Sequence, residues 1–283
     1  MGTVNLAAKY SPKIDERFSR ESITENIGFN KDYDWNGVDT VTVYDVPTVE
    51  LTPYTRSGTS RYGELVELED TKTDYKVEED KSFTYSIDEG NSKSQMDIKM
   101  KEGASLGRQV KEVIIPTLDK YRLKVMSDNA IAEAQYVDGT QLTKTNAYEK
   151  FLAMNEDLDE ANAPVNGRIT FVNPTYYNLL KQDNAFIKNS EIGSKQVING
   201  QIGEVDGNRI IKAPSTYFEN GVVAITIYPK CMTAPMKLKR YVKHTNPMGV
   251  DGMVVEGRIM HDAFILKSKN KAVSVLLSTL PST

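Results

Sequence analysis

The segment that most constrains this chain spans residues 37–88, where two strand-like arms are joined by a long polar connection. Apolar and polar residues alternate over residues 38–46 and again over residues 82–88, with a polar tip at residues 52–63 between them. A two-stranded hairpin without a core is marginally stable in water. A long connection without its own core usually serves a function or covers another surface. We therefore expect this segment to order on a surface supplied by a partner chain.

The composition predicts a soluble chain that is large enough for one large domain or two modest ones. It has 283 residues, of which 39% are hydrophobic, and its apolar runs are too short for a transmembrane helix. The first residues lack the charged and apolar stretches of a secretory signal, so we expect synthesis and assembly in the cytoplasm. The formal net charge of -4 lacks the basic excess of a dedicated nucleic-acid binder, which argues against sequence-specific DNA recognition.

The next feature is a very long helical pattern that follows a polar N-terminal arm. Ser92 and Gln95 fit a capping box, and apolar residues then recur every three or four positions as far as Val125. With a stop at Gly139, the helix would span roughly 65 Å at 1.5 Å per residue. Pro116 predicts a kink or break at Ile115, because proline removes one hydrogen bond of the helix. Two ordinary helices joined at Pro116 are the alternative.

The remaining sequence predicts a compact mixture of helices and strands. A helix begins at Asn146, which with Glu149 makes a second capping pattern. A strand over residues 167–172 leads into a helix that is capped by Asn173 and opened by Pro174. An Asp-Gly turn before residue 209 predicts a hairpin, and the apolar run over residues 221–228 predicts a strand buried on both faces. Residues 256–266 and 272–277 predict two strands that form a C-terminal hairpin, so the fold class is α+β.

Residues with catalytic or metal-binding chemistry are sparse and scattered. The two histidines, His244 and His261, lie far apart, and His261 with Asp262 falls in a predicted strand, where successive side chains face opposite ways. With Cys231 as the single cysteine, the chain can form neither an internal disulfide nor a cysteine-based zinc site, and we expect this residue to be buried or half-buried. The acidic run over residues 64–80 lacks the spacing of a calcium-binding loop. We predict no active site, no cofactor and no metal.

Several motifs along the chain occupy residues 10–18, 41–47, 54–62, 81–88, 108–122, 202–214 and 250–264. In their order and spacing they resemble the major capsid proteins of tailed bacteriophages with the Hong Kong 97-like fold, of the type found in phages of Gram-positive hosts. The resemblance covers nearly the whole chain. The resemblance implies an N-terminal arm (1–36), an extended loop formed by a β-hairpin (37–88), a peripheral domain with a spine helix (89–160), an axial domain (161–255) and a C-terminal hairpin (256–283) that returns to the peripheral domain.

The resemblance implies a structural protein of the virion rather than an enzyme. Copies would form hexamers and pentamers of an icosahedral head around double-stranded DNA, with a portal protein, a separate scaffolding protein and a decoration protein as partners. No lysine lies between Lys31 and Lys72, so the loop tip cannot supply a lysine for a covalent cross-link. An encapsulin-type nanocompartment shell with the same fold is the alternative. A monomeric hydrolase or binding domain is the competitor from a different class.

The charge distribution suggests how neighbouring copies would hold one another. The acidic arm of the loop would dock on basic residues of an adjacent copy's spine region, which sets the register between subunits. The residues expected at these contacts are Tyr54, Arg56, Arg61, Tyr62, Glu67, Glu69, Asp70, Lys99, Lys101, Arg108 and Lys111. In this hypothesis the loop holds by charge and strand pairing.

Overall fold

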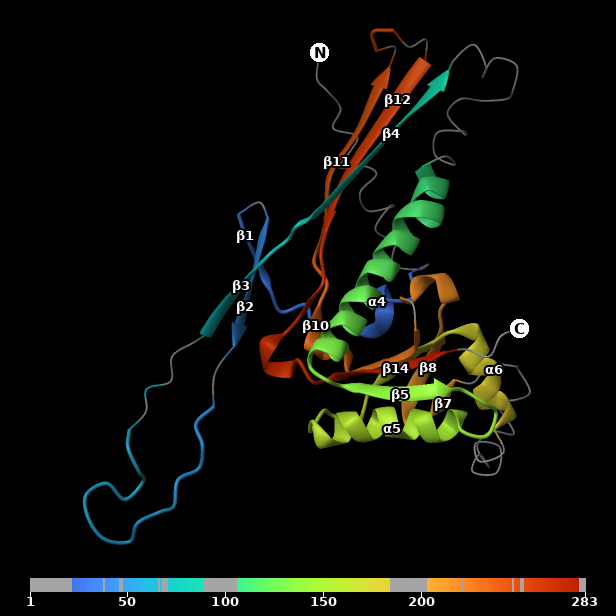
Figure 1. The fold of residues 1–283 in the computed structure, drawn as a ribbon. Coiled ribbons are helices and arrows are strands. Elements are labelled where there is room, and N and C mark those ends of the chain that lie inside the picture. The colour runs from blue at the N-terminus through green and yellow to red at the C-terminus, as the bar shows by residue number, and fades with distance from the viewer. Residues whose placement is uncertain are drawn as a thin grey trace. The chain divides into compact units, whose positions relative to one another are not determined.

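The protein is described from a computed structural model, which covers residues 22–37, 39–45, 48–65, 67, 71–88, 106–183, 203–219, 221–245, 247–249 and 252–279. The chain divides into two units. The smaller unit comprises residues 31–78, and the larger comprises residues 1–30 and 79–283. The predicted α+β class is confirmed, since the chain combines helices with two antiparallel three-stranded sheets, a short antiparallel pair and one mixed six-stranded sheet (Figure 1).

The smaller unit is a three-stranded antiparallel sheet that carries a long loop. Its strands are β1 (Asp34–Asn36), β2 (Thr40–Asp45) and β3 (Thr71–Lys76), in the order β1-β2-β3. The predicted hairpin is therefore wrong in its return arm, because β2 pairs with β3 and not with residues 82–88. Strand β3 lies within the acidic run over residues 64–80. Its charged residues alternate with Thr71, Thr73 and Tyr75, which is the pattern of a strand.

The predicted return arm belongs to a second sheet in the larger unit. This sheet has the order β11-β12-β4, with β11 at Met236–Thr245, β12 at Gly252–His261 and β4 at Glu79–Asp88. All of its pairings are antiparallel. The expected C-terminal hairpin is also wrong, because residues 256–261 lie in this sheet whereas residues 273–279 lie in another. The short pair β10 (Met232–Thr233) and β13 (Phe264–Ile265) continues the antiparallel pairing of β11 with β12 in the same register.

The third sheet of the larger unit has six strands in the order β5-β14-β9-β6-β8-β7. Their bounds are β5 Tyr136–Gln141, β6 Ile169–Val172, β7 Glu204–Val205, β8 Asn208–Lys212, β9 Val222–Ile227 and β14 Val273–Thr279. Every residue of β9 is buried, which confirms the prediction of a strand covered on both faces. The turn at Asp206-Gly207 joins β7 to β8, as predicted.

Helices cover both faces of this six-stranded sheet. On one face, α4 (Ile115–Ala132) packs Leu123, Met126 and Ala130 against Phe171, Ile225 and Val275. On the other face, α5 (Ala147–Glu160) and α6 (Pro174–Gln182) pack against Val172, Ala224 and Leu276. Neighbouring strand residues such as Val275 and Leu276 thus enter different cores, as the alternation of side chains along a strand requires.

The long helix has an internal π-helical turn rather than a break. Residues 106–109 are helical, η2 (Val110–Ile114) is a π-helix, and α4 follows directly. The backbone N–H of Ile115 donates to the carbonyl of Val110, five residues back, and Pro116 stands at the start of α4. The predicted kink at Ile115 therefore takes the form of a wider turn that accommodates the proline. The capping box at Ser92 and Gln95 lies outside the described residues.

The predicted ends of the helices are only partly confirmed by the structure. The stop predicted at Gly139 is wrong, because α4 ends at Ala132 and Gly139 lies in β5. Ala134, with a φ of 57°, closes the helix in the left-handed conformation, and the N–H of Gln135 donates to the carbonyl of Ala130. Asn173 caps α6 as predicted, accepting from the N–H of Tyr176 at 2.7 Å. Asn146 stands at the N-cap of α5, but its side chain bonds the preceding loop at Thr143 and Gln141.

Candidate assembly surfaces

The tip of the extended loop, residues 51–65, is closed by its own hydrogen bonds. The N–H of Thr55 donates to the carbonyl of Arg61 at 3.0 Å, and the Thr52 hydroxyl donates to the carbonyl of Tyr62 at 3.2 Å. Arg61 Nε donates to the carbonyl of Gly58 at 3.1 Å. These bonds cross the loop, so they give the tip a defined backbone without a hydrophobic core beneath it.

Apolar side chains of the loop tip stand in solvent. Leu51 and Leu65 are fully exposed, and Tyr62 is 86% exposed. The rings of Tyr54 and Tyr62 meet edge to face with centroids 5.2 Å apart. Exposed apolar groups gathered on one segment mark an interaction surface more often than scattered single residues do. The tip therefore offers an aromatic and aliphatic contact, in which Tyr54 and Tyr62 were expected from the sequence and Leu51 and Leu65 were not.

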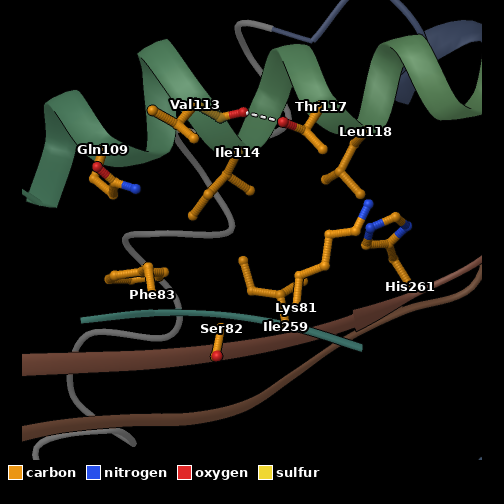
Figure 2. A pocket seen from close by; sticks show the side chains of 10 residues that line it. All are labelled: Lys81, Ser82, Phe83, Gln109, Val113, Ile114, Thr117, Leu118, Ile259 and His261. Carbon is orange, nitrogen blue, oxygen red and sulfur yellow. Dashed lines mark hydrogen bonds between the residues drawn. The ribbon is translucent and has the colours of Figure 1, made fainter. Parts of the chain in front are cut away.

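A groove in the larger unit lies between the N-terminal half of the long helix and the strands β4 and β12. Figure 2 shows its lining, with Val113, Ile114 and Leu118 on the helix side and Phe83 and Ile259 on the strand side. Gln109, Thr117, Ser82, Lys81 and His261 complete the lining. The cavity volume is about 190 Å³. The groove is mostly apolar, with polar groups at its margins.

The strand side of this groove depends on one close approach between two strands. Gly257 of β12 pairs with Phe83 of β4, and the Phe83 ring lies over the glycine. A Cβ atom at position 257 would stand 2.3 Å from Cζ of that ring. Phe83 also stacks on Tyr85 at a centroid distance of 6.3 Å. Glycine at position 257 therefore gives the aromatic ring the space in which it forms the wall of the groove.

His261 closes the groove at the end nearer the core. Its side chain is buried, and its ring meets the Tyr121 ring edge to face at 5.3 Å. The Tyr121 hydroxyl donates to Asp262 Oδ1 at 2.6 Å. Burial lowers the pKa of His261 to about 4, and the positive charge of Lys81 adds to the effect. The imidazole is thus neutral at neutral pH, and it packs on Tyr121 as part of the wall.

A buried polar cluster, which sequence reasoning missed, fixes the start of the described chain to α4. Asp119 is 1% exposed and accepts from the hydroxyls of Ser22 at 2.6 Å and Thr24 at 2.5 Å, and from the N–H of Ile23 at 3.1 Å. Arg122 donates to Thr24 Oγ1 at 2.9 Å and to Glu25 Oε2 at 2.8 Å. An acidic and a basic residue three apart on a helix were the only available signal. The cluster therefore anchors residues 22–25 on α4.

Comparison with known proteins identifies this arrangement. No protein-family model and no curated protein matches the chain. A solved structure from Mycobacterium phage Che8 matches with a TM-score of 0.68 over 90% of this chain and 90% of its own, at 16% identity. A capsid structure of cyanophage P-SCSP1u matches at 0.66 over 92% and 89%, with 11% identity. The mature capsid of bacteriophage PhiM1 matches at 0.59 over 86% and 82%, with 13% identity. The chain has the phage capsid fold.

Within this phage capsid fold, the predicted contact residues fall into three groups. Tyr54, Arg56, Arg61 and Tyr62 lie exposed on the loop tip, and Glu67 lies exposed just beyond it. Of these, the structure brings Tyr54 and Tyr62 together. On the helix, Arg108 pairs with Glu112 one turn further on, with Nε 3.1 Å from Oε1, and Lys111 is exposed. Glu69, Asp70, Lys99 and Lys101 lie outside the described residues.

The part of the phage capsid fold that the structure describes contains no cluster of three metal-ligating side chains. It also contains no helix that is long and apolar enough to cross a membrane. Cys231 is buried as predicted, and burial raises the pKa of its thiol to about 12. The described surfaces that stand out are therefore the loop tip and the groove beside the long helix.

Proposed function

We propose that this chain is the major capsid protein of a tailed phage, with the Hong Kong 97-like variant of the fold. Copies would assemble into hexamers and pentamers of an icosahedral head around double-stranded DNA. The observation that carries the proposal is the match of the fold over 90% of the chain and 90% of its counterpart in the structure from phage Che8, together with a capsid structure of a second phage. In this role the chain is structural and not an enzyme, and it has no cofactor.

The loop tip and the groove suggest how one copy holds the next. The tip exposes the side chains of Leu51, Tyr62 and Leu65. The lining of the groove is mostly apolar and includes Phe83 and Val113. Full burial of one leucine is worth about 1.5–3 kcal/mol. We assign the groove of one copy as the docking site for the tip of a neighbouring copy. A contact of this size is weak by itself, but each copy in a closed shell makes it many times over.

Charged residues beside this contact would fix the register in which two neighbouring copies pack. Glu67 with Glu69 and Asp70 would face Arg108, Lys111, Lys99 and Lys101 of the adjacent copy. The pair between Arg108 and Glu112 is exposed at 75% and 57%, and an exposed helix pair of this kind contributes only about 0.3–0.5 kcal/mol. It can therefore exchange for an intersubunit partner at little cost. Reversal of Glu67, Glu69 and Asp70 to lysine should weaken assembly most at low salt, and assembly that is unchanged across salt concentrations contradicts this part.

Negative-stain microscopy of the purified chain tests the main proposal. Closed shells or free hexamers and pentamers support it, whereas a monomer under every condition points to the hydrolase or binding-domain alternative. Shells that form without portal or scaffold and enclose an enzyme favour an encapsulin. Phage structures among the matches support the phage head instead. The portal, scaffolding and decoration partners follow from the same proposal and are tested by co-purification from infected cells.

Serine substitutions separate the tip contact from the fold. Leu51→Ser with Leu65→Ser removes two fully exposed side chains, so the isolated subunit should keep its stability. The concentration of chain needed for assembly should rise at least about tenfold, the equivalent of 1.4 kcal/mol. Val165→Ser with Met248→Ser, two exposed apolar residues away from the tip, is the matched control. Equal effects of both pairs would refute docking through the tip.

A further inference from the structure

A second hollow in the larger unit lies at one end of the six-stranded sheet. The end of β9 meets the segments that lead into β6 and β14 there, because β9 runs antiparallel to both strands. The cavity volume is about 390 Å³, twice that of the groove beside the long helix. Its lining includes Lys230, Lys269, Lys271, Asn162, Asn270 and Ser268. We call this hollow the lysine pocket.

The backbone that carries these lysines is held by a chain of hydrogen bonds. The N–H of Tyr228 donates to the carbonyl of Ala272 at 3.0 Å, and the N–H of Ala272 donates to the carbonyl of Lys269 at 3.1 Å. The N–H of Leu266 donates to the carbonyl of Cys231 at 2.8 Å. These bonds tie the segment before β14 to the segment after β9. The three lysines therefore have fixed attachment points, although their side chains are exposed.

The charge of the lysine pocket is not neutralised within the described residues. Its lining contains no aspartate or glutamate. In the described part of the chain, no carboxylate forms an ion pair with Lys230, Lys269 or Lys271. Three ammonium groups thus share one hollow in a chain whose formal net charge is -4. Such a local concentration of positive charge attracts anions against the repulsion of the rest of the surface.

We propose that the lysine pocket binds phosphate groups of the DNA backbone, an inference that rests on the proposed function. Lysine binds phosphate as a point charge, and the amides of Asn162 and Asn270 and the hydroxyl of Ser268 can donate to the remaining phosphate oxygens. Contacts to phosphate oxygens carry no sequence information, because sequence is read at the base edges, so this contact is independent of sequence. It gives an acidic subunit one defined point of contact with packaged DNA.

The dependence of DNA binding on salt measures this contact directly. Each phosphate neutralised contributes about -0.9 to the slope of log K against log salt concentration, so three contacts contribute about -2.7. Between 50 and 200 mM salt this corresponds to a loss of affinity of about 40-fold. Anisotropy of a labelled short duplex, titrated with the full-length unassembled chain, gives the slope. Two duplexes of unrelated sequence should give the same value.

The decisive variant combines Lys230→Gln, Lys269→Gln and Lys271→Gln, which are substitutions at exposed positions. Its slope should be smaller than that of the wild type by about 2.7. The combination of Lys120→Gln, Lys144→Gln and Lys150→Gln makes the same change in net charge elsewhere on the larger unit and should leave most of the slope in place. Equal slopes for the two variants, or an unchanged slope in the first, overturn the inference.

Shell formation, followed by microscopy on the same samples, separates this inference from the proposed function. Shells from the wild type together with an unchanged slope in the pocket variant overturn the phosphate site and leave the capsid function standing. Absence of shells under every condition refutes the capsid function, whatever the slope. A pocket variant that loses assembly but keeps its DNA slope shows that the pocket holds carboxylates of a neighbouring copy, which also overturns the inference.

Discussion

The contact between Gly257 and Phe83 gives the sharpest prediction for the groove. In Gly257→Ala the new methyl group would stand 2.3 and 2.4 Å from Cζ and Cε1 of the Phe83 ring. Favourable contacts between carbon atoms lie at about 3.5–4.0 Å, so the ring must retreat by more than about 1 Å. Overpacking of this kind costs about 1–3 kcal/mol. Because the Phe83 ring is part of the wall of the groove, its displacement should also change the shape of the groove.

The sign of the effect should reverse when the ring is removed. Alanine is favoured over glycine inside a strand by about 0.5–1 kcal/mol, because glycine loses more backbone entropy on folding. In a Phe83→Ala background, Gly257→Ala should therefore be neutral or stabilising, although the same change destabilises the wild type. Urea denaturation followed by far-UV circular dichroism gives the four stabilities of this cycle. A cost of Gly257→Ala that is the same with and without Phe83 would refute the reasoning.

Two further predictions concern the buried polar groups. The folded-state pKa of His261 is about 4 and the unfolded value is 6.5, so between these values the unfolded chain binds a proton that the folded chain does not. The free energy of unfolding should therefore fall as the pH drops from 6.5 to 4, by at most about 3 kcal/mol. In His261→Gln, the midpoint of urea unfolding should depend less on pH between these values than it does in the wild type. In Asp119→Ala, three donors of residues 22–24 lose their acceptor, at about 1–3 kcal/mol for each that stays buried. Hydrogen exchange at the amides of Ile23 and Asn30 should then become at least about tenfold faster, whereas exchange at the amide of Val275 should not change. Equal protection of Ile23 and Asn30 in the variant and the wild type would contradict the anchoring role of Asp119.

The sequence was sufficient for elements whose signals are local. Asn173 with Pro174 opens α6, Asp206 with Gly207 makes a turn, and the apolar run of β9 is buried on both faces, because each depends only on residues in its own segment. The pairing of strands does not depend on local residues. The strand at residues 79–88 pairs with β12, whose partner residues lie more than 160 positions away. An alternating pattern identifies a strand and its faces, but it does not name the neighbour.

The sites were less predictable than the elements. Tyr54 and Tyr62 of the tip were expected at a contact, but the exposed residues Leu51 and Leu65 were missed in a segment that is polar on average. The stop of α4 was missed because Ala134, and not a glycine, adopts the left-handed conformation. The groove wall depends on Gly257 and Phe83, which the sequence places 174 residues apart. Such features arise from tertiary packing, and no spacing rule within one segment reports them.

The π-helical turn at residues 110–114 explains why the predicted face of the long helix was only partly right. Val110 is buried as the periodicity requires, but the next buried residue is Ile115, five positions on, whereas Ile114, which the periodicity places on the buried face, is half-buried. An α-helix turns by about 100° per residue, so one extra residue rotates everything that follows by that angle. Val110 before the extra residue and Ile115 and Leu118 after it share one core with the sheet β11-β12-β4, and the later turns pack with the six-stranded sheet. The extra residue therefore keeps both parts of the helix turned toward these cores. In a closed shell, this continuous helix would hold the two sheets of each subunit in one orientation, on which the curvature between neighbouring subunits depends.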